Sequence, residues 1–280
     1  MAGTMPVSPA RAPRLLASTA LAAALAVTAA GCNRTADDIT GSLSARAEAS
    51  APVTPRSDAE WRQALAIWGE RYRKDPGDIQ AAIAYARALR ATDQRAQAVA
   101  VLEQASLRHP NSQIVLGAYG RALADTGQYM QALETLGRAH TPDNPDWRIL
   151  NAQGAVLDQL GRHAEARRHY EAALKIVPGE SSVLCNLGLS YALTKDLALA
   201  EKTLREAAAR PDANQRVRQN LALVVGLQGR FDDAERIASA DLPPTEAEAN
   251  VRTLREMLAQ QTASKKQGKP LRIPRPDAGA

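Results

Sequence analysis

Aromatic residues are scarce in this 280-residue chain, which contains one Phe, three Trp and six Tyr. Proteins that bind single-stranded nucleic acid combine clustered cations with aromatic rings on which the bases stack. Lys and Arg outnumber Asp and Glu by 35 to 30, but the two signs are interleaved along the sequence. The composition therefore argues against nucleic-acid binding.

Cysteine and histidine are also rare, with two and four residues. Two cysteines are too few for a zinc site made of cysteines, and the four histidines do not have the spacing of metal ligands. Phosphate loops, zinc-binding helix pairs, nucleophile elbows and calcium loops are missing as well. We therefore expect no metal, no cofactor and no enzymatic activity.

The sequence contains one extended apolar run, and this run lies near the N-terminus. Residues 1–31 carry Arg11 and Arg14, contain no acidic residue, and are apolar from Leu15 to Ala30. This order is typical of a secretory signal peptide. A transmembrane helix is the alternative, but about 16 mostly Ala residues are few and weakly apolar for crossing a bilayer.

The signal segment ends in Ala29-Ala30-Gly31-Cys32. This motif resembles the lipobox of bacterial lipoproteins, which implies cleavage before Cys32 and acylation of this residue. The alternative is cleavage after Ala30, which would leave a free thiol. Several acyl chains anchor a protein to a membrane where one chain binds only marginally. Since Asn33 is not the Asp associated with inner-membrane retention, we expect the inner leaflet of the outer membrane, facing the periplasm.

Two flanking segments are predicted to be disordered because they hold few large apolar residues. Residues 32–56 form a tether rich in Ser, Thr, Ala and Pro, which follows the acylated cysteine. Residues 263–280 form a basic tail, with contact to anionic lipid or to a partner as an open alternative.

Between these flanks, the sequence repeats with a period of 34 residues and without insertions, in repeats that begin at 79, 113, 147, 181 and 215. Small residues recur at three positions of the repeat. The eighth position holds Ala86, Gly120, Gly154, Gly188 and Ala222; the twentieth holds Ala98, Ala132, Ala166, Ala200 and Ala234; the twenty-seventh holds Ala105, Ala139, Ala173 and Ala207. Small residues at fixed positions allow two helices to approach closely.

This pattern resembles the tetratricopeptide repeat (TPR), which implies an all-α fold, a right-handed superhelix (α-solenoid) of about five helix pairs over residues 79–244. Gly127, Gly161 and Gly229 fall between the two helices of a repeat, where a left-handed C-cap is expected. Residues 57–78 and 245–262 are predicted to be capping helices, the second with Thr245 as its N-cap.

In the TPR family, certain positions of the first helix line a concave groove for peptides. Carried over by position, the partner-binding groove contains Arg87, Arg90, Arg121, Arg148, Asn151, Asn186, Arg216, Gln219 and Asn220. Arg can hold carboxylates and Asn can pair with peptide backbone, although these residues could equally be solvated side chains of an exposed face. Cys185 is expected to be a small residue of the groove wall. Asn186 and Asn220 lie outside the small-residue positions, so their replacement is not expected to affect folding.

A closer resemblance is carried by NQRVRQNLALVVGLQGRF at 214–231 and ADLPP at 240–244. With the lipobox, these stretches are similar to the TadD family of Tad/Flp pilus assembly proteins. The resemblance implies a lipid-anchored, pilotin-like scaffold that binds a secretin or other pilus-assembly components. The alternative is a TPR lipoprotein that anchors or regulates a cell-wall synthase or hydrolase.

Overall fold

The computed structural model describes residues 57–267, and side chains up to residue 263. The predicted signal peptide, Cys32, the tether and the tail beyond 267 lie outside these residues. The described part contains twelve helices: α2 (Asp58–Lys74), α3 (Ile79–Ala91), α4 (Arg95–Arg108), α5 (Gln113–Asp125), α6 (Tyr129–Gly137), α7 (Trp147–Gln159), α8 (His163–Ile176), α9 (Ser181–Leu193), α10 (Leu197–Ala208), α11 (Gln215–Leu227), α12 (Phe231–Ala238) and α13 (Pro244–Gln267). Between residues 57 and 267, no helix is both long enough and apolar enough to cross a bilayer.

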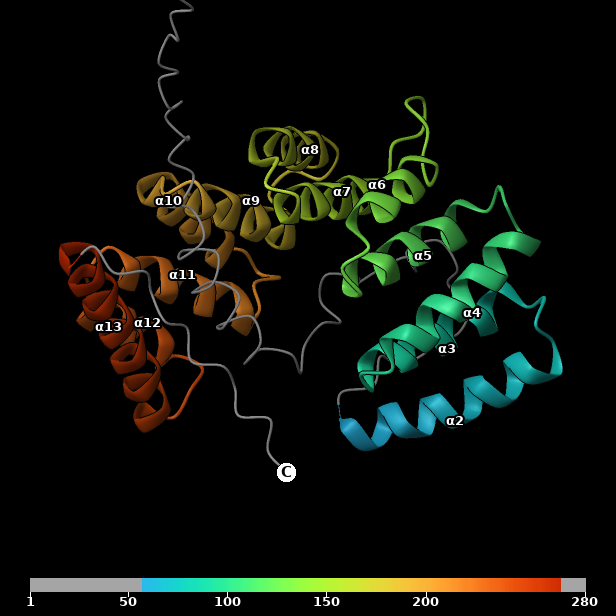
Figure 1. The fold of residues 1–280 in the computed structure, drawn as a ribbon, viewed down its shortest axis with the longest axis horizontal. Helices are drawn as coiled ribbons and strands as arrows, with labels where there is room; N and C mark the ends of the chain where they lie inside the picture. Colours follow the sequence, from blue (N-terminus) through green and yellow to red (C-terminus); the bar gives the residue numbers. More distant parts are fainter. Residues whose placement is uncertain (1–56, 268–280) are drawn as a thin grey trace, which may run out of the picture.

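The helices form antiparallel pairs that follow one another along an arc, with α2 at one end and α13 at the other (Figure 1). The first helices of the pairs are α3, α5, α7, α9 and α11, and each of them contacts the first helix of the next pair. The second helices contact each other much less. The first helices therefore form the inner layer of the arc, and the expected all-α solenoid is confirmed.

The start of most inner helices is fixed by a side chain that the repeat pattern did not identify. Asp78, Ser112, Asp146 and Asn214 each precede such a helix and accept a hydrogen bond from a backbone N–H of its first turn. Because these N–H groups have no partner within the helix, a polar N-cap stabilises the start by about 1 kcal/mol.

The turn inside each pair requires one residue with positive φ. Gly127, Gly161 and Gly229 have φ between 75° and 83°, as predicted for left-handed C-caps. Asp93 and Lys195 hold the same place in the first and fourth pairs, with φ of 61° and 66°. A residue with a Cβ adopts this conformation at a cost of about 1–2 kcal/mol, so these two turns store strain that glycine would remove.

The two helices of a pair pack closely at the eighth repeat position. A Cβ added to Gly120, Gly154 or Gly188 would come within 2.5–2.7 Å of the side chain opposite, which is Leu136, Tyr170 or Leu204. Real Cβ atoms do not approach other atoms this closely, so a larger residue at any of these three positions would force the side chain opposite or the helices to shift. The predicted role of the small residues is thereby confirmed.

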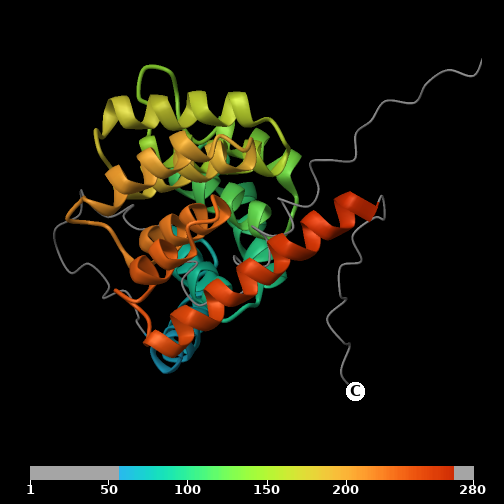
Figure 2. The ribbon, with the colours of Figure 1, turned by 90° about the vertical axis from the view of Figure 1, so that its left-hand side faces the viewer.

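Both ends of the solenoid are covered by single helices. Helix α2 begins with a capping box between Ser57 and Glu60, and its Trp61 is buried. Helix α13 begins at Pro244, so Thr245 lies inside the first turn and is not the predicted N-cap; Pro is well suited to the first helical position. The same helix continues to Gln267, beyond the predicted end near 262, because no helix-breaking residue precedes Gly268. Figure 2 shows its last turns extending past the helices on which it packs.

Candidate functional site

The nine predicted groove residues all lie on inner-layer helices, but they differ in burial and in partners. Arg87 and Arg90 are on α3, Arg121 is on α5, Arg148 and Asn151 are on α7, Asn186 is on α9, and Arg216, Gln219 and Asn220 are on α11. Arg121, Asn151 and Asn186 are buried, while the other six are partly exposed.

Three arginines come together where the first three inner helices meet. Arg90 of α3 forms an ion pair with Asp125 of α5. Arg121 of α5 lies within electrostatic range of Arg90, Arg148, Asp125 and Asp146. These five residues, from three successive repeats, are called the arginine cluster below.

The guanidinium of Arg121 is the most deeply buried charge of this cluster. Only 7% of the residue is exposed. Burial, helped by the positive charges of Arg90 and Arg148, lowers the pKa of Arg121 to about 10, and the two Asp residues oppose this shift. Arg121 is still protonated at neutral pH, so the interior of the inner layer holds a positive charge.

Two arginines of the predicted groove, one of them from the arginine cluster, stack on aromatic rings. The guanidinium carbon of Arg87 lies 5.5 Å from the ring centre of Trp61, and that of Arg148 lies 4.6 Å from the ring centre of Trp147. A cation above an indole ring gains roughly 0.5–1 kcal/mol at exposed sites. The first contact holds Arg87 against the capping helix α2, and the second holds Arg148 along α7.

The predicted asparagines bond to the neighbouring repeat. Nδ2 of Asn186 donates to Oδ1 of Asn151 over 3.0 Å, and both side chains are buried. Nδ2 of Asn220 lies 3.1 Å from Sγ of Cys185, in the same diagonal relation one repeat later. The buried bond between Asn186 and Asn151 argues against the expectation that folding is little affected by replacing Asn186, because a buried amide that loses its partner destabilises the fold.

Cys185 is a buried free thiol on the inner-layer helix α9. Burial raises the pKa of its thiol, and the charge of Arg216 together with the bond from Asn220 lowers it only in part. Since the thiolate is the nucleophile, a buried thiol with a raised pKa is unreactive.

A polar cluster around Asp158 was not predicted. The Asp158 carboxylate accepts hydrogen bonds from His163 (2.8 Å), Tyr170 (3.0 Å) and Ser190 (2.8 Å), and its side chain is 7% exposed. In a Ser-His-Asp triad the imidazole lies between the hydroxyl and the carboxylate. Here the Ser190 hydroxyl donates directly to the carboxylate, so the His163 imidazole is not placed to take the proton of that hydroxyl. The cluster instead joins the third and fourth repeats.

One residue signals this cluster in the sequence. Tyr170 occupies a position that holds Leu in three of the other four helix pairs, Leu102, Leu136 and Leu204, and Ala238 in the last pair. A buried tyrosine hydroxyl needs a hydrogen-bond partner. Burial and the Asp158 carboxylate raise the pKa of this hydroxyl, so it remains a neutral donor.

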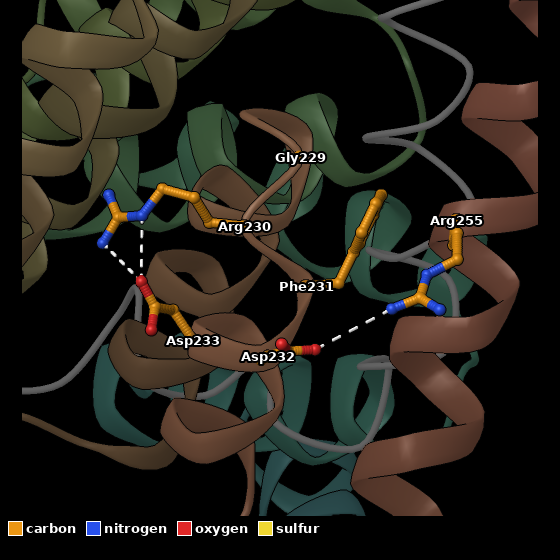
Figure 3. Close-up of a pocket in the computed structure, with 6 residues that line it drawn as sticks. All are labelled: Gly229, Arg230, Phe231, Asp232, Asp233 and Arg255. Atoms are coloured by element: carbon orange, nitrogen blue, oxygen red, sulfur yellow. Dashed lines mark hydrogen bonds and ion pairs between the residues drawn. The ribbon is translucent and has the colours of Figure 1, made fainter.

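An open depression lies between α12 and α13 and is lined by Gly229, Arg230, Phe231, Asp232, Asp233 and Arg255 (Figure 3). Arg255 of α13 points toward the start of α12, stacks on Phe231 at 4.6 Å, and lies 4.0 Å from Asp232. Arg230 pairs with Asp233 at 2.8 Å and with Glu201 at 2.9 Å. The charges are mutually paired, and the arrangement fixes the capping helix against α12.

Groups of three or more metal-ligating side chains do not occur between residues 57 and 263. The inner face with its arginine cluster is the candidate site for binding because it gathers charged side chains from three successive repeats.

Comparison with known proteins identifies the repeats. A family model described as tetratricopeptide repeat matches residues 83–146, 118–181 and 151–215. No curated protein sequence matches the chain.

Among solved structures, the type IV pilus biogenesis factor PilW superposes with a TM-score of 0.60 at 18% identity, covering 69% of this chain and 91% of PilW. The APC/C hetero-tetramer Cut9-Hcn1 gives a TM-score of 0.56 at 16% identity over 71% of this chain, which spans only 40% of the matched chain. A monomeric IFIT1 mutant with m7Gppp-AAAA gives 0.58 at 15% identity over 76% of this chain and 53% of IFIT1. At such identities these likenesses show the fold, and the fold occurs with very different ligands.

Proposed function

The helix pairs of this chain are tetratricopeptide repeats, and from that premise we propose that it is a non-enzymatic, protein-binding scaffold of the bacterial envelope. The observation that carries this proposal is the inner layer of helices, which brings together charged side chains from three successive repeats. Extended inner faces of this kind are the binding surfaces of solenoid proteins.

We further propose that the scaffold assists the assembly or localisation of a Tad/Flp-type pilus or its secretin. Two observations support this assignment: the similarity of 214–231 and 240–244 to the TadD family, and the fold shared with the pilus biogenesis factor PilW over most of that protein. The lipobox-like motif at Cys32 supports a lipid anchor in the outer membrane. Such an anchor would hold the inner face of the solenoid in the periplasm, where secretin subunits pass.

The test compares secretin assembly in cells with and without this chain. Membranes are analysed for secretin multimers, and the chain, carrying an affinity tag, is isolated from detergent-solubilised envelope with its bound proteins. We expect the multimers to decrease when the chain is deleted and the secretin to be recovered with the tagged chain. Unchanged multimers together with recovery of a cell-wall synthase or hydrolase would contradict the pilus assignment.

A further inference from the structure

The repeat pattern extends into α2, which has the place of a second helix but is the first helix of the described residues. Counting back 34 residues from α4, Ala64 lies at the twentieth repeat position and Trp68 at the twenty-fourth. In a complete pair these positions face the first helix: a Cβ at Gly120 would meet side-chain atoms of Leu136 and the carbonyl oxygen of Ala132. The side of α2 that carries Ala64 and Trp68 is therefore the side that a first helix would cover.

The burial of these positions differs between α2 and the complete pairs. In the five complete pairs the residue at the twentieth position is at most 1% exposed, and so are Leu102, Leu136, Tyr170 and Leu204 at the twenty-fourth. Ala64 and Trp68 are only partly buried, and the neighbouring Ile67 is 56% exposed. The adjacent side of α2 packs on the core through Leu65 and Tyr72. At the end of the arc (Figure 1), α2 thus has a partly uncovered apolar face.

Charges along this face select the direction of a helix that would cover it. Glu60, Ala64, Trp68 and Arg71 follow one another at spacings of four, four and three residues, so they form one stripe along α2. The stripe runs from an acidic first turn to a basic last turn, with Asp58 and Glu60 at the start and Arg71, Arg73 and Lys74 at the end. An antiparallel helix with the same order of charges would bring opposite charges together at both ends.

The two charged residues of the stripe have partners within the chain and still face solvent. Glu60 belongs to the capping box with Ser57. Arg71 pairs with Asp78 over 2.8 Å, its side chain is 57% exposed, and its guanidinium carbon lies 5.4 Å from the ring centre of Trp68. These contacts hold Trp68 and Arg71 together on the uncovered face.

We propose that this face binds α2 of a second copy of the chain, in an antiparallel pair in which each α2 takes the place of a first helix for the other. Glu60 of each copy then lies opposite Arg71 of the other, and Ala64 lies opposite Trp68. A large side chain opposite a small one is also the arrangement inside a complete pair, where Tyr170 packs over Gly154. Because the same stripe serves both copies, the contact is two-fold symmetric and closed.

The size of the contact sets its expected strength. A helix of 17 residues is about 25 Å long, and one such helix per copy buries less than the roughly 1,200 Å² of stable complexes. We therefore expect a weak dimer, with a dissociation constant on the order of 10–100 μM. The dimer does not depend on the pilus assignment, because its test needs only the purified chain.

Sedimentation equilibrium of the full purified chain measures the dimer directly. Every sample carries Cys32→Ser, so that acyl chains cannot cause association. Ala64→Trp places Trp opposite Trp, Trp68→Ala places Ala opposite Ala, and Leu107→Ala is the control on α4, where Leu107 is 69% exposed. We expect the first two variants to weaken dimerisation on the order of tenfold or more, as for the loss of a central aromatic anchor, and the control to match the wild type.

A mixture of Ala64→Trp and Trp68→Ala tests the pairing itself. One copy then supplies Trp at both positions and the other supplies Ala at both, so each contact again joins one large and one small side chain. We expect the mixture to form a heterodimer with nearly the wild-type affinity, although each variant alone dimerises poorly. Added salt should weaken the wild-type dimer, because opposite charges meet at its ends. No recovery in the mixture, or a dimer that salt strengthens, would overturn the proposal.

Melting curves at concentrations below the dissociation constant show whether the variants fold. If either of them does not, Ala64→Lys takes its place, because a long flexible side chain can reach solvent in the single chain but meets Trp68 in the dimer. This variant should weaken dimerisation on the order of tenfold or more. Wild-type affinity in Ala64→Lys, or a wild type that stays monomeric up to about 1 mM, would also overturn the proposal and leave this face to residues 32–56 or to another protein.

Discussion

The close contact between Gly154 of α7 and Tyr170 of α8 gives a quantitative test of the repeat packing. A Cβ at position 154 would lie 2.5 Å from Cε1 and 2.8 Å from Cδ1 of the Tyr170 ring. The ring cannot easily move, because it is 1% exposed and its hydroxyl is bonded to Asp158. Gly→Ala in a helix interior gains about 0.5–1 kcal/mol, whereas overpacking costs about 1–3 kcal/mol. We expect Gly154→Ala to lower the stability by about 1–2 kcal/mol, or roughly 2–8 °C in melting temperature for a domain of this size.

Gly137 provides the matched control. It is the last residue of α6, its φ is not positive, and an added Cβ would meet no atom within 4 Å. Gly137→Ala should therefore gain up to about 0.5–1 kcal/mol from helix propensity alone. Thermal and urea denaturation of the two variants and the wild type measure the difference. Equal stability of Gly154→Ala and Gly137→Ala would refute the packing argument.

A second substitution tests the cause of the loss. The first repeat pairs Ala86 with Leu102 at the same two positions, and both are buried. In the Tyr170→Leu background, Gly154→Ala recreates this pair and should cost less than it does opposite the ring. A double-mutant cycle gives this coupling directly. No coupling would mean that the ring is not the obstacle.

Three further predictions concern the turns, the inner face and the anchor. Lys195→Gly should raise the stability by about 1 kcal/mol, because it removes the left-handed strain of an exposed turn residue; a lower melting temperature would contradict this. Asn186→Ala should destabilise the fold by about 1–3 kcal/mol, because buried Asn151 loses its donor. In denaturation experiments, the double variant Asn151→Ala/Asn186→Ala should lose less stability than the sum of the losses of the two single variants. Cys32→Ser should abolish acylation and release the folded chain from the outer membrane, and sedimentation with that membrane after a high-salt wash would show another anchor.

The helix pairs could be predicted from the sequence because their packing depends on residue size at fixed spacing. Small residues at the eighth, twentieth and twenty-seventh positions together placed the starts of the inner helices at the residues where the structure has them. The positive φ of the turn glycines followed from the same register. Size and backbone conformation are properties of a single position, so they can be recognised before any partner residue is known.

The polar contacts could not be predicted in this way because they join residues from different repeats. The Asp158 cluster takes its donors from α8 and α9, and their convergence depends on how successive pairs are rotated. The burial of Arg121 has the same origin, since Arg87 occupies the equivalent position of the first repeat and is only partly buried. The position of a residue within the repeat indicates the helix face on which it lies, but neither how deeply its side chain is buried nor which residues it contacts.

The distribution of polar contacts divides the inner face into two parts. In the third to fifth repeats, the side chains directed at neighbouring helices bond to each other, through Asn151 with Asn186, Asp158 with Ser190, and Cys185 with Asn220. Such bonds fix the rotation between successive repeats, and a partner could use these groups only by breaking them. In the first three repeats the corresponding layer contains Arg121, whose Nε has no hydrogen-bond partner among residues 57–263, and an ion pair between Arg90 and Asp125 joins the first two repeats. Neutral hydrogen bonds and the Asp158 carboxylate therefore connect successive inner helices in the C-terminal half, whereas charged side chains gather between them in the N-terminal half.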